Sequence, residues 1–212
     1  MIRILVVDDH TMVRAGLCRL LEGEHDMTVV GQTGSGREAV QLCRTLDPNV
    51  VLLDYSLPDL DGLETTRQIV GLSQGVRILV LTMYANEEYA TRVIRAGASG
   101  FIAKVASTEE LLHAIRKVAQ RGVYVSPPIL ERMVTRIGRD QEDAPESALS
   151  DREMQVLIQL ARGATSREVS KTLSLSMSTV ETYRSRILEK LGVRNNSDIT
   201  RFAIRRGLVE IE

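Results

Sequence analysis

Four short apolar runs constrain the fold of this chain more than any other feature of its sequence. None of the runs contains a polar residue, and each one ends at a charged or hydroxyl side chain. The runs cover residues 4–7, 50–53, 78–81 and 101–103. Apolar runs of this length are typical of strands buried on both faces, as in a parallel sheet with helices on both sides. The sequence therefore predicts a covered α/β sheet.

Helical patterns between these runs indicate how the strands connect. Apolar residues recur at helical spacing within residues 12–21, 37–46, 64–72, 87–96 and 109–119, and residues 27–30 form one more strand-like run. Strand and helix thus alternate five times with short connections, which predicts a doubly wound, five-stranded parallel sheet. Ser107 and Glu110 have the spacing of a capping box at the start of the fifth helix.

Polar side chains follow the apolar runs directly. Asp8 and Asp9 follow the first run, Asp54 follows the second, and Thr82 and Lys104 follow the last two. The carboxyl ends of parallel strands meet at the edge where open α/β sheets bind ligands, so we expect these side chains to lie together. A single aspartate after a strand is usually a turn or capping residue. Acids, a hydroxyl and an amine from four strands instead favour a functional site.

Residues 122–147 interrupt the alternating pattern. Pro127 and Pro128, followed by apolar residues at helical spacing, predict one short amphipathic helix with proline in its first turn. Residues 138–147 are polar, contain proline and have no periodicity, which is typical of a domain boundary. The sequence predicts three segments, a first domain, a linker with a short helix and a second domain, over residues 1–121, 122–147 and 148–212.

The second domain has only helical patterns. Two capping boxes, Ser150 with Glu153 and Thr165 with Glu168, start two helices, and Gly163 stands between them where a chain reversal requires it. A short polar turn then precedes a helix over residues 177–191, which Gly192 ends, and a last helix covers residues 197–206. A short helix, a tight turn and a longer helix within an all-α unit of four helices predict a helix-turn-helix domain.

The net charge of −1 conceals a difference between the two domains. Residues 148–206 contain eleven Lys or Arg against six Asp or Glu. A basic excess of this kind favours nucleic-acid binding, although scattered arginines on a solvated helical face give similar counts.

Cys18 and Cys43 lie in apolar helical patterns without metal or redox spacing, so we interpret them as core residues in a reducing compartment. No stretch approaches the roughly 20 apolar residues that span a membrane, and the chain begins with a strand pattern rather than a signal peptide. The sequence predicts a cytoplasmic protein without a membrane partner.

Several motifs occur in the order and at the spacings of one known family. The first domain contains ILVVDDH (4–10), VVLLDYSLPDLDG (50–62), LVLTMY (79–84) and GASGFIAK (97–104). The second contains LSDREMQVL (149–157), STVETYRSRILEKLGVRN (178–195) and RRGL (205–208). Over essentially its whole length the chain resembles the NarL/FixJ family of two-component response regulators. The resemblance implies a flavodoxin-like receiver domain followed by a LuxR-type helix-turn-helix domain.

The resemblance implies that a sensor histidine kinase phosphorylates Asp54. A carboxylate and a phosphoryl group are both anionic, so a divalent cation must screen them during transfer. Mg²⁺ prefers hard oxygen ligands, and we expect Asp8, Asp9, Asp54 and the carbonyl group of Ser56 to bind it. Asp9 is the expected direct ligand, whereas Asp8 acts directly or through water. Such a protein is a regulator rather than an enzyme, because it catalyses only its own phosphoryl transfer and dephosphorylation.

Three more residues of the first domain have implied roles after phosphorylation. Lys104 pairs with the phosphoryl oxygens, and Thr82 donates a hydrogen bond to one of them. Phe101 turns inward and remodels a face of the receiver, which implies homodimer formation on activation. A plain core role for Phe101 remains equally open, since burial is the default for phenylalanine.

The resemblance makes residues 177–191 the recognition helix for double-stranded promoter DNA. Glu181, Thr182 and Ser185 lie toward its amino end and on its outer side, so we expect them to read base edges. The other expected contacts are mainly to phosphates. The full predicted set is Thr165, Ser166, Ser178, Thr179, Glu181, Thr182, Tyr183, Ser185, Arg186, Lys190 and Arg194.

Glu181 departs from the family pattern, which very often has lysine at this position. Its carboxylate either accepts a hydrogen bond from a cytosine amino group or closes a capping box with Ser178, and we slightly favour the capping box. Leu208, Val209 and the last helix are implied to supply a dimer contact.

Three alternative classes fit the sequence less well. Residues 34–39 (GSGREA) fit a dinucleotide fingerprint with Asp54 as a ribose ligand. However, they follow the second strand rather than the first, and a dinucleotide site would give Asp8, Asp9, Thr82 and Lys104 no function. A phosphatase with an aspartyl-phosphate intermediate requires a second acid at the position of Ser56. A receiver regulated by a small molecule or a protein instead of phosphate is disfavoured, because the full set of site residues is present.

Overall fold

The structure is a computed structural model that describes residues 1–72, 75–83, 86–137, 145–206 and 208–209. The chain divides into two compact units, Met1–Thr135 and Arg136–Glu212. Most of the predicted boundary, residues 138–144, lies outside the described residues, as do Tyr84 and Gly207. No helix among the described residues is long and apolar enough to cross a lipid bilayer.

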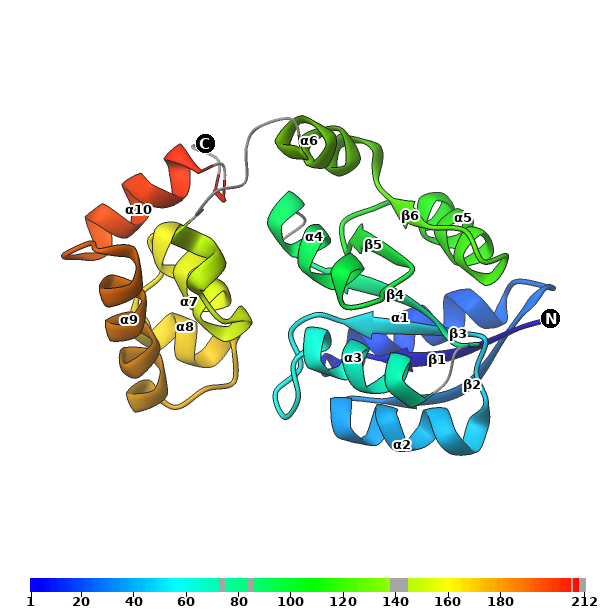
Figure 1. Ribbon diagram of the computed structural model, residues 1–212. Coiled ribbons are helices and arrows are strands. Elements are labelled where there is room, and N and C mark those ends of the chain that lie inside the picture. Colours follow the sequence, from blue (N-terminus) through cyan, green and yellow to red (C-terminus); the bar gives the residue numbers. More distant parts are fainter. Residues whose placement is uncertain (73–74, 84–85, 138–144, 207, 210–212) are drawn as a thin grey trace. The chain divides into compact units, whose positions relative to one another are not determined.

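The first unit alternates strand and helix, as the sequence predicts (Figure 1). Its elements are β1 (Ile2–Val7), α1 (Thr11–Glu22), β2 (Met27–Thr33), α2 (Gly36–Leu46), β3 (Val50–Asp54), α3 (Gly62–Leu72), β4 (Arg77–Thr82), α4 (Glu87–Arg95), β5 (Gly100–Ala103), α5 (Thr108–Ala119), β6 (Tyr124–Val125) and α6 (Pro127–Ile137). The short proline-started helix of the predicted linker is therefore confirmed as α6.

All strands are parallel and follow the order β2-β1-β3-β4-β5-β6. The order reverses between β1 and β3, so the carboxyl ends of these two strands flank the crevice where such sheets bind ligands. The doubly wound parallel sheet is confirmed, with one strand more than the five predicted. The additional strand, β6, is only two residues long and pairs Tyr124 with Gly100 and Val125 with Phe101. Two residues are too few to show a strand pattern in a sequence.

The sheet is covered on both faces, which explains the apolar runs without alternation. Successive side chains of a strand point to opposite faces. On one face, Val6, Leu52 and Leu81 join an apolar cluster with residues of α1 and α5. On the other face, α2 packs beside α3 and α3 beside α4 (Figure 1).

Cys18 and Cys43 are buried free thiols, as predicted. Burial raises the pKa of both, that of Cys43 to about 11. Both thiols therefore stay protonated at neutral pH and act as small apolar groups.

The predicted capping box of α5 is only half formed. Ser107 Oγ accepts a hydrogen bond from the backbone N–H of Glu110 at 3.1 Å, as predicted. Glu110 does not complete the box, because its Oε1 accepts a hydrogen bond from the hydroxyl group of Tyr124 at 2.8 Å. The unpredicted strand β6 places Tyr124 there, so the wrong half of this prediction follows from the missed strand.

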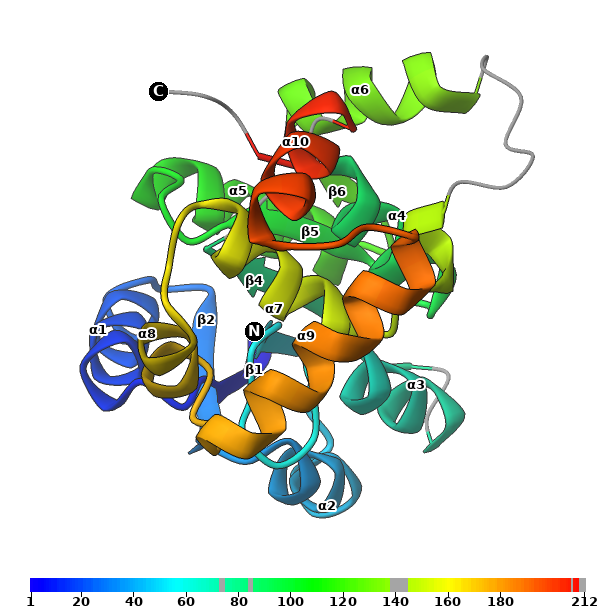
Figure 2. The ribbon, with the colours of Figure 1, turned by 90° about the vertical axis from the view of Figure 1, so that its left-hand side faces the viewer.

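The second unit consists of a short 3-10 helix, η1 (Pro145–Ala148), followed by α7 (Asp151–Ala161), α8 (Ser166–Thr172), α9 (Met177–Leu191) and α10 (Asn196–Arg205) (Figure 2). The four predicted helices are confirmed, and α8, α9 and α10 all pack against α7. Both predicted capping boxes are complete at α7 and α8. Gly163 and Gly192 have positive φ angles of 89° and 64°, which glycine adopts without strain at these chain reversals.

Helix α9 has one buried side. Val180 and Ile187 are its buried residues, and Leu191 at its carboxyl end is half-buried. Leu208 and Val209 are themselves buried, at 4% and 6% exposure. They have little apolar surface left for a second protomer, which weakens their implied role in a dimer.

Glu153 joins α7 to α9. Its Oε2 accepts hydrogen bonds from the backbone N–H of Ser150 at 2.7 Å and from Lys190 Nζ at 2.6 Å. Burial acts to raise the pKa of Glu153, but the hydrogen bonds from Lys190 and Ser150 outweigh it and hold the pKa below its ordinary value of 4.5. A pKa that is lower in the folded state gives stability above the unfolded pKa, and this stability is lost as the pH falls through the folded pKa.

Replacing Glu153 should therefore remove part of the acid sensitivity of the second unit. We expect Glu153→Gln to lower the free energy of unfolding at pH 7 by about 2 kcal/mol, because hydrogen bonds to a charged group are lost. The wild type should lose this advantage as the pH falls below 4.5. Urea unfolding followed by NMR signals of α7 and α9 measures the difference. Glu189→Gln, an exposed change on α9, is the matched control, and an equal effect of both changes would contradict the prediction.

Candidate functional site

The carboxyl ends of four strands bring the predicted polar residues together. Lys104 Nζ lies 2.7 Å from Asp8 Oδ2 and 2.8 Å from Asp54 Oδ2, so one ammonium group bridges β1, β3 and the end of β5. The backbone N–H of Lys104 donates to the carbonyl oxygen of Thr82 at 2.7 Å, which joins the end of β4. Asp8, Asp54 and Thr82 are at most 2% exposed.

Asp9 and His10 complete this cluster, which we call the acidic site (Asp8, Asp9, His10, Asp54 and Lys104). His10 Nδ1 lies 2.7 Å from Asp9 Oδ1 and 3.4 Å from Asp8 Oδ1. His10 was not predicted as a site residue, although it directly follows the two acids in the ILVVDDH motif. Two carboxyl groups of this site, those of Asp8 and Asp54, contact the ammonium group of Lys104, and the third, that of Asp9, contacts His10.

The acidic site fits a divalent cation. One ligand atom from each of Asp8, Asp9, His10 and Asp54 lies within 4.8 Å of the others. Asp8 Oδ2, Asp9 Oδ1 and Asp54 Oδ2 are buried without a well-oriented hydrogen bond among the described residues, and their close contacts are the nitrogens of Lys104 and His10. Buried carboxylate oxygens with spare acceptor capacity are suitable ligands for Mg²⁺. The Asp8–Asp9–Asp54 part of the predicted ligand set therefore has the chemistry of a magnesium site.

Burial and charge shift two pKa values in the site. Burial raises the pKa of Asp54 above its ordinary value of 3.8, and the neighbouring Asp8 adds to the shift, while Lys104 opposes both. Burial acts to lower the pKa of Lys104, but Asp54 and Asp8 outweigh it, so the pKa of Lys104 is raised. Lysine therefore stays charged, and the ionised form of Asp54 is less favourable in the folded protein than in water.

The loop after Asp54 is held close to the site. The backbone N–H of Ser56 donates to Asp54 Oδ1 at 3.2 Å, and the N–H of Gly62 donates to the carbonyl oxygen of Tyr55 at 2.9 Å. A Cβ atom at position 62 would lie 2.7 Å from Tyr55 Cα and 2.8 Å from the carbonyl oxygen of Asp54, so only glycine allows this approach. Ser56 is thereby fixed two residues beyond Asp54.

Asp59, which was not predicted as a functional residue, holds the other side of this loop. Its carboxylate accepts hydrogen bonds from Ser35 Oγ at 2.7 Å and from the backbone N–H groups of Gly36 and Arg37 at 2.9 and 3.1 Å. Partial burial acts to raise the pKa of Asp59, but these three hydrogen bonds outweigh it and lower the pKa. The local signal was present, since acidic residues suit a helix amino terminus, but the partner helix lies more than 20 residues away in the sequence.

The contacts of Asp59 also exclude the dinucleotide alternative. A dinucleotide pyrophosphate would need the free N–H groups at the start of α2. The carboxylate of Asp59 already accepts hydrogen bonds from Gly36 and Arg37 there.

Thr82 and Phe101 both lie in the buried sheet. Phe101 is 0% exposed and is paired with Val80 of β4 and Val125 of β6. Its side chain therefore points inward here, which fits a core residue and also the inward state of a switch. Beside the site, the rings of Tyr55 and Tyr89 are in contact, with centroids 4.7 Å apart and planes tilted by 51°, which connects the loop after Asp54 to α4.

The charge balance of the site predicts that replacing Asp54 stabilises the protein without Mg²⁺ and destabilises it, relative to the wild type, with Mg²⁺. A carboxyl group whose pKa is raised by folding destabilises the folded state once the pH is above both pKa values. At pH 7 without Mg²⁺, we expect the free energy of unfolding of Asp54→Asn to exceed that of the wild type by about 1 kcal/mol, so the variant should unfold at a higher urea concentration. Mg²⁺ should stabilise the wild type, by about 3 kcal/mol at a hundredfold excess over its Kd, and the variant much less.

Urea unfolding followed by NMR signals of the first unit, with Mg²⁺ or with a chelator, measures both effects. Glu22→Gln, an exposed change on α1, is the control. A variant less stable than the wild type without metal would contradict the proposed charge balance.

The predicted DNA-contacting residues form an exposed surface on α8 and α9. Five of them line a shallow groove of about 270 Å³, namely Ser178, Thr179, Thr182, Tyr183 and Arg186. Ser185 lies exposed on the same helix, and Thr165 and Ser166 lie at the start of α8. The structure therefore gathers most of the predicted set in one place.

The preferred interpretation of Glu181 is wrong. The cap of α9 is Ser176, whose Oγ accepts from the backbone N–H of Thr179 at 3.1 Å, and Ser178 lies inside the first turn. Glu181 Oε1 instead accepts a hydrogen bond from Ser166 Oγ at 2.6 Å. Three serines, Ser174, Ser176 and Ser178, alternate with apolar residues around the start of α9, so local spacing could not distinguish which one caps the helix.

Two of the basic residues that are predicted to bind phosphates have acidic partners within the unit. Lys190 Nζ contacts Glu153, and Arg194 Nε lies 3.3 Å from Asp198 Oδ2. Arg186 has no such partner among the described residues. Of these three cations, Arg186 is the one best placed to bind a phosphate.

Comparisons with known proteins match both units. The family described as "Response regulator receiver domain" matches residues 4–116, and the family described as "Bacterial regulatory proteins, luxR family" matches residues 147–203. Response regulator UvrY of Escherichia coli (strain K12) is 38% identical over 213 residues, covering 100% of this chain and 98% of that protein. Response regulator GacA of Pseudomonas aeruginosa is 37% identical over 211 residues, covering 99% of each chain.

A solved structure agrees with this assignment. The crystal structure of response regulator ChrA, described as part of a heme-sensing two-component system, is 30% identical with a TM-score of 0.54 and covers 98% of each chain. The parallel sheet with its acidic site and the separate four-helix unit define a response regulator that combines a receiver with a LuxR-type DNA-binding domain. The chain belongs to the NarL/FixJ family of two-component response regulators.

Proposed function

We propose that a sensor histidine kinase phosphorylates Asp54, and that the phosphorylated receiver forms a homodimer that binds promoter DNA. The observation that carries this proposal is the buried pairing of Asp54 with Lys104, beside two more acids at the carboxyl ends of the strands. A structural ion pair would need one acid for one lysine. Two acids on one lysine, with a third acid beside them, instead suit a site that receives further positive charge and then a phosphoryl group.

Each residue of the acidic site has its own role in the proposed phosphoryl transfer. A carboxylate oxygen of Asp54 attacks the phosphorus atom, the new O–P bond forms, and the bond to the kinase's histidine nitrogen breaks. Asp8, Asp9, Asp54 and the carbonyl group of Ser56 would hold Mg²⁺. When bound, Mg²⁺ screens the charges of the carboxylate and the phosphoryl group. Lys104 Nζ lies 2.8 Å from Asp54 Oδ2, so its ammonium group can form an ion pair with an oxygen of a phosphoryl group on Asp54.

Two buried residues are placed to report the modification. Thr82 ends β4 next to the site, and its hydroxyl group can donate to a phosphoryl oxygen. Phe101, in the neighbouring strand, already points inward. We propose that the contact of Thr82 stabilises this inward state and alters the face around α4, β5 and α5, where a second protomer binds.

We propose that the receiver covers residues 1–121, that residues 122–147 form the linker, and that residues 148–212 bind DNA. The family matches over residues 4–116 and 147–203 support these limits. Transfer of the signal between the two domains then depends on the linker, which includes α6.

We propose that α9 enters the major groove, with Glu181, Thr182 and Ser185 toward the bases and Arg186 toward a phosphate. The exposed groove on α9 and the fixed position of Glu181 support this arrangement. Since the capping role of Glu181 is excluded, a cytosine amino group is its expected partner.

The phosphorylation switch can be tested with beryllofluoride, which mimics the phosphoryl group. With Mg²⁺ and beryllofluoride, we expect the wild type to become dimeric in gel filtration and to bind a promoter probe at least about tenfold more tightly, whereas Asp54→Ala should change neither property. Asp47→Asn, remote from the site in the left-handed cap of α2, is the control and should respond as the wild type does. If a folded, Mg²⁺-binding wild type does not respond, the receiver is not switched at Asp54.

The role of Glu181 can be tested by binding-site selection from randomised DNA. A glutamine side chain pairs with adenine, whereas a carboxylate accepts from cytosine, so Glu181→Gln should change the preferred base at one position, worth about 1–3 kcal/mol. Glu189→Gln, farther along α9, should leave the selected sequence unchanged. An unchanged preference in Glu181→Gln would assign Glu181 only the contact with Ser166.

A further inference from the structure

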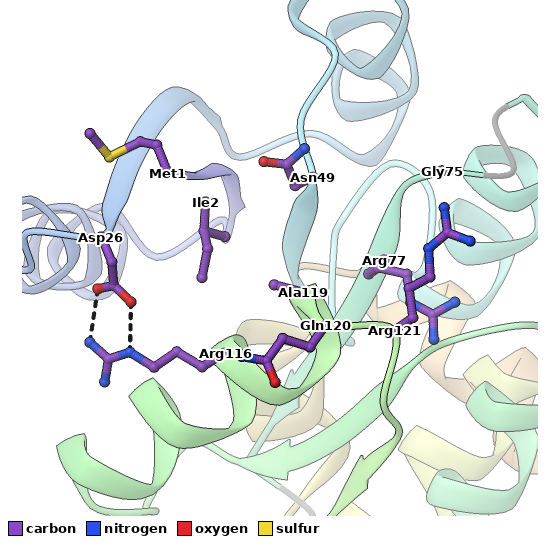
Figure 3. A pocket seen from close by; sticks show the side chains of 10 residues that line it. All are labelled: Met1, Ile2, Asp26, Asn49, Gly75, Arg77, Arg116, Ala119, Gln120 and Arg121. Carbon is purple, nitrogen blue, oxygen red and sulfur yellow. Dashed lines mark hydrogen bonds and ion pairs between the residues drawn. The ribbon is translucent and has the colours of Figure 1, made fainter.

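A second pocket, of about 510 Å³, lies at the amino ends of the strands (Figure 3). Ile2 of β1 and Arg77 of β4 line it, together with Asp26 before β2 and Asn49 before β3. The strands are parallel, so this pocket is at the opposite end of the sheet from Asp54. It has no part in the phosphoryl transfer proposed above.

Three arginines line this pocket, and they differ in their partners. Arg116 is neutralised, since its Nε lies 2.8 Å from Asp26 Oδ2 and its Nη2 lies 2.7 Å from Glu24 Oε2. Figure 3 shows Arg116 extended toward Asp26, with Arg77 and Arg121 on the other side of the pocket. Within the described part of the chain, neither Arg77 nor Arg121 has an acidic partner. Two guanidinium groups are therefore left without a counter-charge.

Arg77 also has an unused hydrogen-bond donor. Its Nη2 donates to the carbonyl oxygen of Gly122 at 3.3 Å, but its Nε is buried and has no hydrogen-bond partner among the described residues. A buried N–H of a charged group without an acceptor is unfavourable. An anion in the pocket would supply the missing negative charge beside this guanidinium group.

Arg121 occupies an unusual backbone conformation. Its φ angle is 64°, in the left-handed region that favours glycine, and glycine follows only at position 122. The negative end of the α5 dipole favours a cation at this place and would explain Arg121 by itself. It does not explain the buried, unpartnered Nε of Arg77 in the same pocket.

We propose that Arg77 and Arg121 bind the phosphate group of a small organic phosphate about as large as a mononucleotide. Guanidinium groups pair with phosphate oxygens through two parallel hydrogen bonds. The volume of the pocket lies within the range of roughly 300–1,000 Å³ that small-molecule sites have. Asn49 and Asp26 supply polar groups for hydroxyl groups of the ligand, and Ile2 supplies an apolar contact. The receiver would then respond to a metabolite as well as to its kinase.

NMR titration of the full-length, ¹⁵N-labelled protein tests this site. Inorganic phosphate and adenosine monophosphate are the two probes, each added at constant ionic strength. We expect saturable shifts of the backbone signals of Gly75, Arg77 and Gln120. Arg77→Gln should weaken binding by about tenfold or more, because a charged hydrogen bond is lost. Equal affinities would mean that phosphate alone suffices, and tighter binding of adenosine monophosphate would mean that the rest of the molecule contributes; both support the site.

Two further variants keep the test independent of folding. Arg121→Gly removes the charge and relieves the positive φ angle, so weaker binding cannot be explained by a disturbed backbone. Arg44→Gln, an exposed arginine in the last turn of α2, should bind both probes as the wild type does. Shifts that do not saturate, shifts confined to the region of Lys104, or unchanged affinity in Arg77→Gln and Arg121→Gly would each overturn the proposal.

Discussion

The shared ammonium group of Lys104 is the interaction on which the receiver depends. It contacts Asp8 from β1 and Asp54 from β3, two strands that are adjacent only because the sheet order reverses between them. Buried charges of one sign repel strongly unless an opposite charge lies close by. Lys104 therefore allows the strand ends to meet. It leaves the site with excess negative charge, which is the condition that the proposed binding of a cation and then of a phosphoryl group requires.

The same charge excess explains why the site must be supported from outside. Asp54 is held by the hydrogen bond from Ser56, and the following loop is tied to α2 by Asp59 and to Tyr55 by Gly62. None of these contacts is part of the proposed chemistry. They restrict where the carboxylate of Asp54 and the carbonyl group of Ser56 can lie, which is what a small, strictly octahedral cation such as Mg²⁺ requires.

Most of the fold and the centre of the site could be predicted because their signals are local. Buried strands, amphipathic helices and two capping boxes leave spacings within a few residues of each other. The errors arise where the partner is distant or the local signal is degenerate. Asp59 pairs with a helix more than 20 residues before it, and Glu110 pairs with Tyr124 through a strand too short to show a pattern. Among the serines around the start of α9, only the fold selects Ser176 as the cap.

The charge of the DNA-binding unit could not be interpreted from the sequence alone either, because a count of basic residues does not show which of them are paired with acids. The eleven basic residues of this region suggest strong phosphate binding, yet Arg184, Lys190, Arg194, Arg201 and Arg206 each lie within ion-pair distance of an acid. Glu153 and Glu146 are buried, so Lys190 and Arg206 stabilise the fold by neutralising them and are less available to DNA phosphates. Each phosphate contact contributes separately to affinity. A single unit with few unpaired cations is therefore expected to bind weakly, and two units in the proposed dimer would gain from effective concentration without any new contact. The charge distribution of the second domain thus gives the proposed homodimer a physical purpose, because two units would bind DNA more tightly than one.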